Sequence, residues 1–412
     1  MNIETVIRNA EQAVKPVFEK IDETAQINTE KVLKAFWDNN VSEAMLHGST
    51  GYGNDDRGRD TLEAVVAQTF GAEDALVRHT FVSGTHTLCT AFFALLRPGD
   101  TLYSVSGYPY DTLLETIGVR GEKGKGALAD FGIRYRHTEL NPDGSPNIDE
   151  IRSVLKTDPS IRLVFMQRSR GYAARRTLCP EHIKQICDTV RECTDAPIMV
   201  DNCYGEFIRP QEPLSYGADI IAGSLIKNPG GGLAQTGGYI AGKKDLVELC
   251  SYRHTAVGIG KENGATLDQL SRMFQGFFMA PHTVAQALKT EVFAAKVFED
   301  CGYNVSPLYS EERDDIIQQI TLNSEEKMLA FCKGIQHASP IDSFVTPEAW
   351  EMPGYADRVV MAAGTFVQGS SIELSADGPL KPPYIVYMQG GLTYESGKAA
   401  IKKVLAELSQ EK

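Results

Sequence analysis

Two residues with complementary chemistry, Lys227 and Asp201, each end an apolar run. Lys227 lies in the string G-S-L-I-K-N-P-G-G-G, and Asp201 ends the run A-P-I-M-V-D twenty-six residues earlier. The cofactor pyridoxal phosphate (PLP) needs a lysine to hold its aldehyde as a Schiff base and a carboxylate to keep its pyridine nitrogen protonated. The carboxyl ends of parallel strands open on one crevice, so both residues can face one ligand. Alone, each is more typical of a surface lysine or a capping aspartate, but the pair predicts a PLP site.

A phosphate group could bind where S-G-T-H-T-L begins a predicted helix. Backbone N–H groups and the helix dipole favour an anion at such a start. Gly84 allows the backbone to approach closely, and Thr85 and His86 open the helix. Ser224, three residues before Lys227, could add a hydroxyl. A plain capped turn is the simpler interpretation of this string taken alone.

Two loops carry further candidates. G-Y-P-Y-D-T offers Tyr110 as a flat surface that could stack on an aromatic ring, and a half-buried loop tyrosine is an equally good interpretation. The glycine-rich loop G-Y-G-N-D-D-R-G-R-D holds Tyr52, Arg57 and Arg59. Arginine forks suit phosphates or carboxylates, whereas a solvated turn would need no ligand.

Composition excludes several classes of protein. The 412 residues carry a net charge of −13, which argues against nucleic acid or an anionic membrane as a partner. The eight cysteines show no zinc-ligand spacing, and neither His86 nor His254 has a partner at ligand spacing, so we expect no metal site. We expect reduced thiols and a cytoplasmic protein, because no targeting segment or membrane-spanning run is evident.

The element pattern predicts an α/β protein. Residues 1–45 read as two amphipathic helices, and strands alternate with helices from about 61 to 242, which favours a mostly parallel sheet covered on both faces. A helix over 282–300 leads to a smaller α+β unit that ends in a helix from Tyr394. We therefore predict an arm and loop over 1–60, a large domain over 61–285 and a small domain over 286–412. The expected strands are 80–83, 101–106, 133–136, 161–167, 197–201, 219–224, 237–242, 371–375 and 383–388.

The assembled pieces resemble the PLP-dependent transferase-like (fold type I) enzymes, and within them the cystathionine β-lyase/methionine γ-lyase-like group known as aluminium-resistance proteins. The resemblance runs from about Gly51 almost to the C-terminus. It rests on strings that include G-R-D-T-L-E, S-G-T-H, P-Y-D-T-L, Q-R-S-R-G-Y, V-D-N-C-Y-G-E-F, G-S-L-I-K-N-P-G-G-G, I-E-L-S-A-D-G-P and Y-M-Q-G-G-L-T-Y-E.

The resemblance implies a role for each candidate. Lys227 would be the Schiff-base lysine and Asp201 the pyridine partner. The phosphate would lie on Gly84, Thr85 and Ser224, with His86 beside them, and Tyr110 would stack on the ring. Tyr52 and an arginine such as Arg57 would reach the cofactor of a neighbouring subunit in a homodimer or homotetramer.

The substrate carboxylate is a separate question. The transsulfuration lyases hold it with an arginine near the C-terminus, where this chain reads Y-M-Q-G-G-L. Arg168 and Arg170 directly follow the predicted strand 161–167, and they are the best replacements, with Arg57 or Arg59 next. An ordinary surface role for both Arg168 and Arg170 stays open.

The implied activity is a carbon–sulfur lyase that acts by β- or γ-elimination on a cystathionine-, cysteine- or methionine-type amino acid. The freed Lys227 amine, with its pKa lowered by a cationic site, would remove the α-proton. An aminotransferase shares the first half of this chemistry. A PLP-fold binding or regulatory protein with little turnover is the alternative outside enzymes.

Overall fold

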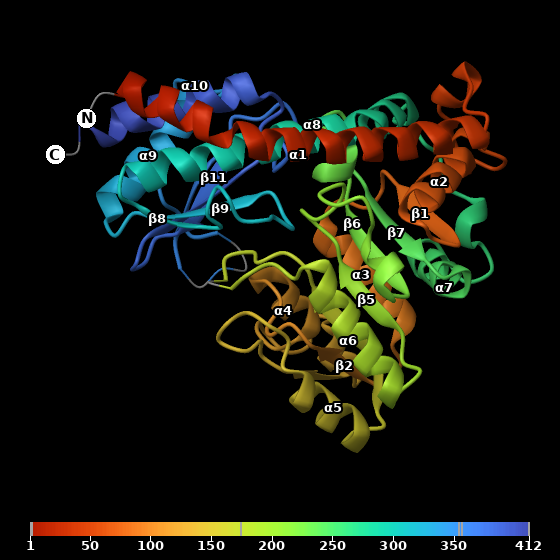
Figure 1. Cartoon of the computed structure of the whole chain (residues 1–412). Helices are drawn as coiled ribbons and strands as arrows, with labels where there is room; N and C mark the ends of the chain where they lie inside the picture. The colour runs from red at the N-terminus through yellow and green to blue at the C-terminus, as the bar shows by residue number, and fades with distance from the viewer. Residues whose placement is uncertain (1–2, 174, 353–354, 356, 411–412) are drawn as a thin grey trace.

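The computed structural model describes residues 3–173, 175–352, 355 and 357–410. Figure 1 shows a large unit built around one sheet, a second unit that carries the C-terminal strands, and two long helices that lie side by side across both. These helices are α1 (Ile3–Asp38) and α8 (Leu270–Asp300). The arrangement confirms the predicted fold class.

The large sheet has the strand order β1-β7-β6-β5-β4-β2-β3. Strands β3, β2, β4, β5 and β6 pair in parallel, and β7 is antiparallel to both its neighbours. The strands are β1 (Asp74–Arg78), β2 (Thr101–Ser104), β3 (Arg134–His137), β4 (Ile161–Gln167), β5 (Ile198–Asp201), β6 (Ile220–Ser224) and β7 (Gly238–Gly242).

Both faces of this sheet are buried, which explains why its strands read as almost continuous apolar runs. In β5, for example, Val200 belongs to the core under one face and Met199 to the core under the other. The first core is completed by α2 (Arg57–Phe70), α5 (Ile148–Thr157), α6 (Pro180–Cys193) and part of α8. The second is completed by α3 (Gly84–Leu95), α4 (Asp111–Ile117) and α7 (Lys244–His254).

The C-terminal unit is an antiparallel sheet of order β10-β11-β12-β9-β8, with helices on one face. Its elements are β8 (Asn304–Ser306), β9 (Ile317–Thr321), α9 (Glu325–Ala338), β10 (Val359–Ala362), β11 (Ser375–Pro379), β12 (Ile385–Gln389) and α10 (Tyr394–Leu408). The predicted final helix from Tyr394 is confirmed. Helix α8 passes unbroken through the domain boundary predicted at 285, with Leu288 in the first core and Phe293 in the core of the C-terminal unit.

The prediction of two helices over residues 1–45 is wrong, because α1 continues unbroken to Asp38 and only a short 3₁₀ turn, Glu43–Leu46, follows. The polar stretch after Val17 suggested a break. However, Ile21 still packs on the core, and Lys289 of α8 holds Asp22 at 2.6 Å, so the contact stripe along α8 is continuous.

Two predicted strands are also misplaced. Residues 80–83 form a turn and the cap of α3, while β1 lies at Asp74–Arg78, where it pairs with β7. Residues 371–375 mostly precede β11, which begins at Ser375. Among the described helices none is long and apolar enough to cross a membrane.

Candidate active site

A cavity of about 790 Å³ lies between the carboxyl ends of β4, β5 and β6 and the C-terminal sheet. Lys227, Asp201 and Ser224 line it together from the large unit, and Asp377 and Tyr387 line it from the C-terminal unit. The parallel pairing explains the first group, because Gln167 is in register with Asp201, and Asp201 with Ala222 of β6. The sequence-based expectation that the strand ends converge is therefore confirmed for this edge of the sheet.

Lys227 and Asp201 both contact the turn that follows β5. The Lys227 Nζ atom lies 4.0 Å from the ring centroid of Tyr204. One oxygen of Asp201 accepts a hydrogen bond from the Cys203 backbone N–H at 3.1 Å. This leaves the amine and the carboxylate facing the same cavity.

Burial shapes the protonation of this pair. It raises the pKa of Asp201, while nearby Lys227 and Arg175 act in the opposite direction. Burial lowers the pKa of Lys227, but the acidic groups around it, Asp201 among them, raise it well above its usual value. The expected lowering by a cationic site concerns the enzyme with its cofactor and stays a prediction.

The start of α3 forms the other end of the site. The Ser83 hydroxyl accepts from the His86 backbone N–H at 3.1 Å, and the Ser83 carbonyl accepts from Thr87 N–H. The N–H groups of Gly84 and Thr85 lie in the first turn, where a helix offers no acceptor of its own. Gly84 and Thr85 both line the cavity, so these N–H groups are available to an anion there.

The surroundings of Gly84 and Ser224 fit a phosphate. The Ser224 hydroxyl is buried without a hydrogen-bond partner among the described residues, which is costly unless a ligand satisfies it. A Cβ on Gly84 would lie 3.4 Å from both Cys203 Sγ and Ser224 Cβ, so the cradle is tight. An orphaned hydroxyl, free helix N–H groups, a lysine and a buried carboxylate together match the groups of PLP.

Tyr110 is anchored beside this cradle. Its hydroxyl is 2.9 Å from Thr85 Oγ1, and its backbone N–H donates to Gln167 Oε1 at 2.9 Å. Burial raises the pKa of the phenol well above its usual value, so the ring stays neutral. The ring is thus fixed on the wall of the cavity, as a stacking role requires.

Three other candidates are not brought to the cavity. The His86 side chain accepts from Val82 N–H at 3.3 Å and packs edge-on against Phe81, outside the lining. Tyr52 is 78% exposed, and Arg57 is also exposed. The predicted loop over residues 51–60 is too long, because α2 begins at Arg57 and Asp56 caps it. The shorter loop that ends at Arg57 is nevertheless fixed, because the buried Arg59 donates to Gly53 O at 2.7 Å.

The two arginines after β4 have different surroundings. The Arg168 guanidinium points into the protein, where it donates to Asn202 Oδ1 at 2.8 Å and to Gly205 O at 2.9 Å. It lies 3.6 Å from Glu212 and does not line the cavity. Arg170, in contrast, lines the cavity. The structure therefore favours Arg170 as a substrate ligand and gives Arg168 a structural role.

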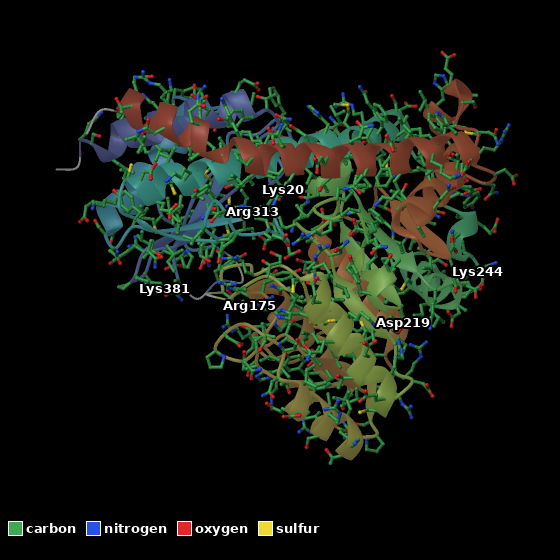
Figure 2. All side chains as sticks on the ribbon, viewed as in Figure 1. Lys20, Arg175, Asp219, Lys244, Arg313 and Lys381 are labelled. Atoms are coloured by element: carbon green, nitrogen blue, oxygen red, sulfur yellow. The ribbon has the colours of Figure 1, made fainter. Side chains whose placement is uncertain are left out.

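Arg170 is held from several sides, and its Nε lies 4.0 Å from the Asp315 carboxylate. Its Nη1 donates to Gln319 Oε1 at 2.9 Å and to Ser306 Oγ at 3.1 Å. Its Nε has no hydrogen-bond partner among the described residues. Arg175 fixes the segment by donating to Ser169 O at 2.6 Å, and Figure 2 shows Arg175 at the junction of the two units.

Behind the strand ends lies a sealed polar network. The Tyr239 hydroxyl donates to Glu206 Oε1 at 2.8 Å, and Asn202 lies 3.3 Å from the same hydroxyl. Burial raises the pKa of Glu206 to about 8, so this carboxyl is protonated at neutral pH. Its Oε1 atom would lie only 2.5 Å from a Cβ at Gly223, directly before Ser224.

The sequence reasoning missed the C-terminal wall of the cavity, to which Asp377, Tyr387 and Gln389 contribute. The available signal was a charged residue inside the apolar context of S-A-D-G-P, within a string already quoted for the family resemblance. The described residues hold no group of three His, Cys, Asp or Glu side chains placed to bind a metal.

Comparison with known proteins agrees with this site. A family model described as methionine gamma-lyase matches residues 3–409. An uncharacterized Bacillus subtilis protein, YnbB, is 48% identical over 402 residues, which cover 97% of this chain and 95% of that protein. The crystal structure of a carbon–sulfur lyase involved in aluminum resistance from Clostridium novyi has a TM-score of 0.95 and 49% identity, covering 98% of this chain and 95% of that one. A PLP-dependent protein from Escherichia coli, YhfS, shares the fold alone, with a TM-score of 0.63 and 14% identity over 95% of this chain and 97% of its own.

Proposed function

Since the chain belongs to the methionine gamma-lyase family, we propose that it is a PLP-dependent carbon–sulfur lyase that acts on a sulfur-containing amino acid by β- or γ-elimination. The observation that carries the proposal is that one cavity is lined by Lys227, Asp201 and Ser224, whose hydroxyl has no hydrogen-bond partner in the part of the chain that the structure describes. When bound, the cofactor supplies an electron sink for the negative charge that develops at the substrate α-carbon.

The residues of the chain would divide the work. Lys227 would hold the cofactor aldehyde and, once displaced by the substrate amine, carry the α-proton on Nζ. Asp201 would keep a proton on the pyridine nitrogen, and burial strengthens that interaction by excluding water. Gly84, Thr85 and Ser224 would hold the phosphate, and Tyr110 would orient the ring.

Arg170 would bind the substrate carboxylate in place of a C-terminal arginine. Arg170 reaches the cavity from the end of β4. The string Y-M-Q-G-G-L, where an arginine was expected, instead contributes Tyr387 of β12 to the cavity. A buried carboxylate needs a fork of donors, and the Arg170 guanidinium, which lines the cavity, can supply one.

Product analysis tests the proposal. Purified holoprotein incubated with cystathionine, cysteine or methionine should release ammonia, a 2-oxo acid and a thiol (hydrogen sulfide in the case of cysteine) in equal amounts, and Lys227→Ala should release none. Transfer of the amino group to an added 2-oxo acid without thiol release would instead identify an aminotransferase. Cofactor binding without any product would identify a binding protein.

We also propose a cytoplasmic homo-oligomer in which the loop of Tyr52 and Arg57 reaches a neighbouring subunit. The loop is ordered by internal bonds, since Gly264 N–H donates to Tyr52 O at 2.8 Å and Leu267 N–H to Ser49 O at 3.1 Å. Yet it presents Tyr52 and the 56% exposed Leu267 to solvent. A fixed loop with exposed apolar side chains suits an interface.

All eight cysteines are free thiols, which suits a reducing compartment.

A further inference from the structure

The C-terminal wall of the cavity carries a buried carboxylate, Asp377, to which the proposed reaction gives no role. Asp377 is 5% exposed and lies on β11, directly opposite Tyr387 of β12. Tyr387 in turn lies opposite Gln319 of β9. The neighbours of Asp377 in its own strand, Ala376 and Gly378, point to the other face, where Ala376 belongs to the core. Asp377 therefore points toward the cavity that it lines.

Asp377 forms no salt bridge within 4.0 Å among the described residues, although the charge of Lys227 is near enough to act on its pKa. Two other carboxylates of the lining are paired, Asp111 with Arg120 and Asp357 with Lys381. One Asp377 oxygen accepts from Gln389 Nε2 at 3.0 Å, and the Tyr172 hydroxyl is near enough to lower the pKa of Asp377, but the buried Oδ1 has no hydrogen bond of normal geometry among the described residues. A buried charge with a free oxygen is costly, and a ligand cation would offset that cost.

Aromatic rings surround the same place. The ring centroids of Tyr172 and Tyr387 lie 5.0 Å apart, and those of Tyr172 and Tyr355 lie 5.7 Å apart. All three rings line the cavity. Burial raises the pKa of Tyr172 well above its usual value and that of Tyr387 to about 12, so these phenols are neutral at physiological pH. Neutral tyrosine faces attract cations.

Arg170 and Asp377 stand at opposite sides of Tyr387. Arg170 holds Gln319, which lies one strand from Tyr387, and Asp377 lies one strand beyond it on the other side. The backbones of Gln319 and Asp377 are therefore two strand spacings apart, which is about 10 Å. An amino acid whose carboxylate meets Arg170 would therefore extend its side chain toward Asp377.

We propose that Asp377, with Tyr172, Tyr355 and Tyr387, binds a second cationic group at the far end of the substrate side chain. The α-amino group of the substrate reacts at the cofactor, so the cation must be a distal ammonium or a similar group. The substrate class is then an amino acid with a thioether and a distal cation, as in cystathionine-type diamino acids. This inference rests on the proposed function and narrows its substrate.

The test uses two matched pairs of ligands on the holoenzyme. S-(2-aminoethyl)cysteine and S-propylcysteine differ only in ammonium against methyl, and their kcat and KM values are measured. Lysine and 2-aminoheptanoic acid form the same pair without a leaving group, so calorimetry gives their Kd values independently of turnover. We expect the cationic member of each pair to bind roughly 30-fold tighter, the range for a desolvated charge pair.

Variants assign the effect to Asp377. Asp377→Asn should remove the preference by weakening the cationic ligand alone. Asp357→Asn is the matched control, because Asp357 also lines the cavity but is paired with Lys381 at 2.6 Å, and it should keep the preference. Equal affinities in the wild type, or a preference that survives Asp377→Asn, would overturn the proposal.

A pH series tests the same idea without a variant. Burial raises the pKa of Asp377 to about 6, against the opposing effects of the Tyr172 and Gln389 side chains and of the Lys227 charge, which face it across the cavity. The preference for lysine over 2-aminoheptanoic acid should therefore be lost as the pH falls through about 6, and an unchanged ratio would contradict the inference. Thiol release from S-propylcysteine as fast as from the aminoethyl compound would defeat this inference alone. Failure to release thiol from any compound would defeat the proposed function.

Discussion

Arg170 and Gln319 are 149 residues apart in sequence, yet the Arg170 Nη1 donates to Gln319 Oε1 at 2.9 Å. This bond joins the end of β4 in the parallel sheet to β9 in the antiparallel sheet. It places a guanidinium beside Tyr387, in the strand whose string Y-M-Q-G-G-L lacks an arginine. The Arg170 guanidinium in the cavity therefore comes from the large unit and not from the C-terminal unit.

Arg170→Lys should weaken substrate binding by about ten-fold or more, because an ammonium cannot reproduce the guanidinium fork. Cofactor content should stay at the wild-type level, because Arg170 is not one of the residues placed at the cofactor. Titration of the holoprotein with amino acids, followed by the cofactor absorbance, gives both quantities.

Arg168→Lys is the matched control for this experiment. Arg168 is buried against Asn202 and Gly205 and does not line the cavity. The change should lower the melting temperature but leave the amino-acid affinity of the folded fraction unchanged. If Arg168→Lys weakened affinity and Arg170→Lys did not, the assignment of the two arginines would be reversed.

Asp201→Asn should bind the cofactor but lose turnover on the order of 100-fold. The amide cannot hold the proton on the pyridine nitrogen, so the electron sink is lost. Single-turnover kinetics should place the loss in the chemical step. Wild-type rates in this variant would show that Asp201 has another role.

Glu206→Gln should make the protein less sensitive to alkaline pH. The folded pKa of Glu206, about 8, lies above its ordinary value of 4.5, so the folded state holds a proton that the unfolded state releases in this window. Stability from this group therefore falls as the pH rises from about 4.5 to 8, by a total on the order of 5 kcal/mol. A glutamine can still accept from Tyr239.

Melting curves of the wild type and Glu206→Gln check this sign. The wild type should lose more stability than the variant between pH 5 and pH 8.5, while groups common to both proteins cancel. Parallel pH profiles would mean that Glu206 is not the titrating group.

Sedimentation should show a dimer or a larger closed assembly. Tyr52→Ala, in the exposed part of the ordered loop, should reduce cofactor affinity if that loop completes a neighbouring site. Phe344→Ala is a control, because Phe344 is 85% exposed on the C-terminal unit, away from the loop. A fully active monomer would refute the shared site.

The fold was predictable where sequence periodicity and strand ends agree. The runs before Gln167, Asp201 and Ser224 are buried on both faces, so they read as parallel strands that open on one crevice. The single long helix α1 was not predictable. Its contact stripe continues only because Ile21 and Asp22 meet α8, which is a tertiary contact.

The cofactor end of the site was predictable and the C-terminal wall was not. Lys227, Asp201 and Gly84 lie in local strings whose residue types and spacing indicate their chemistry. The role proposed for Asp377 depends on its position opposite Tyr387 and on the absence of a salt bridge to it among the described residues. Neither can be seen in the sequence. Arg168 and Arg170 are equivalent in sequence, and only packing separates them.

The most direct test of the account is the identity of the lysine that carries PLP. The purified holoprotein is reduced with borohydride, digested and mapped by mass spectrometry. We predict that the cofactor is attached to Lys227, which lines the cavity beside Asp201 and Ser224, and that Lys227→Ala yields no labelled peptide. Label on any other lysine, or an unlabelled Lys227 in protein that contains PLP, would contradict the account.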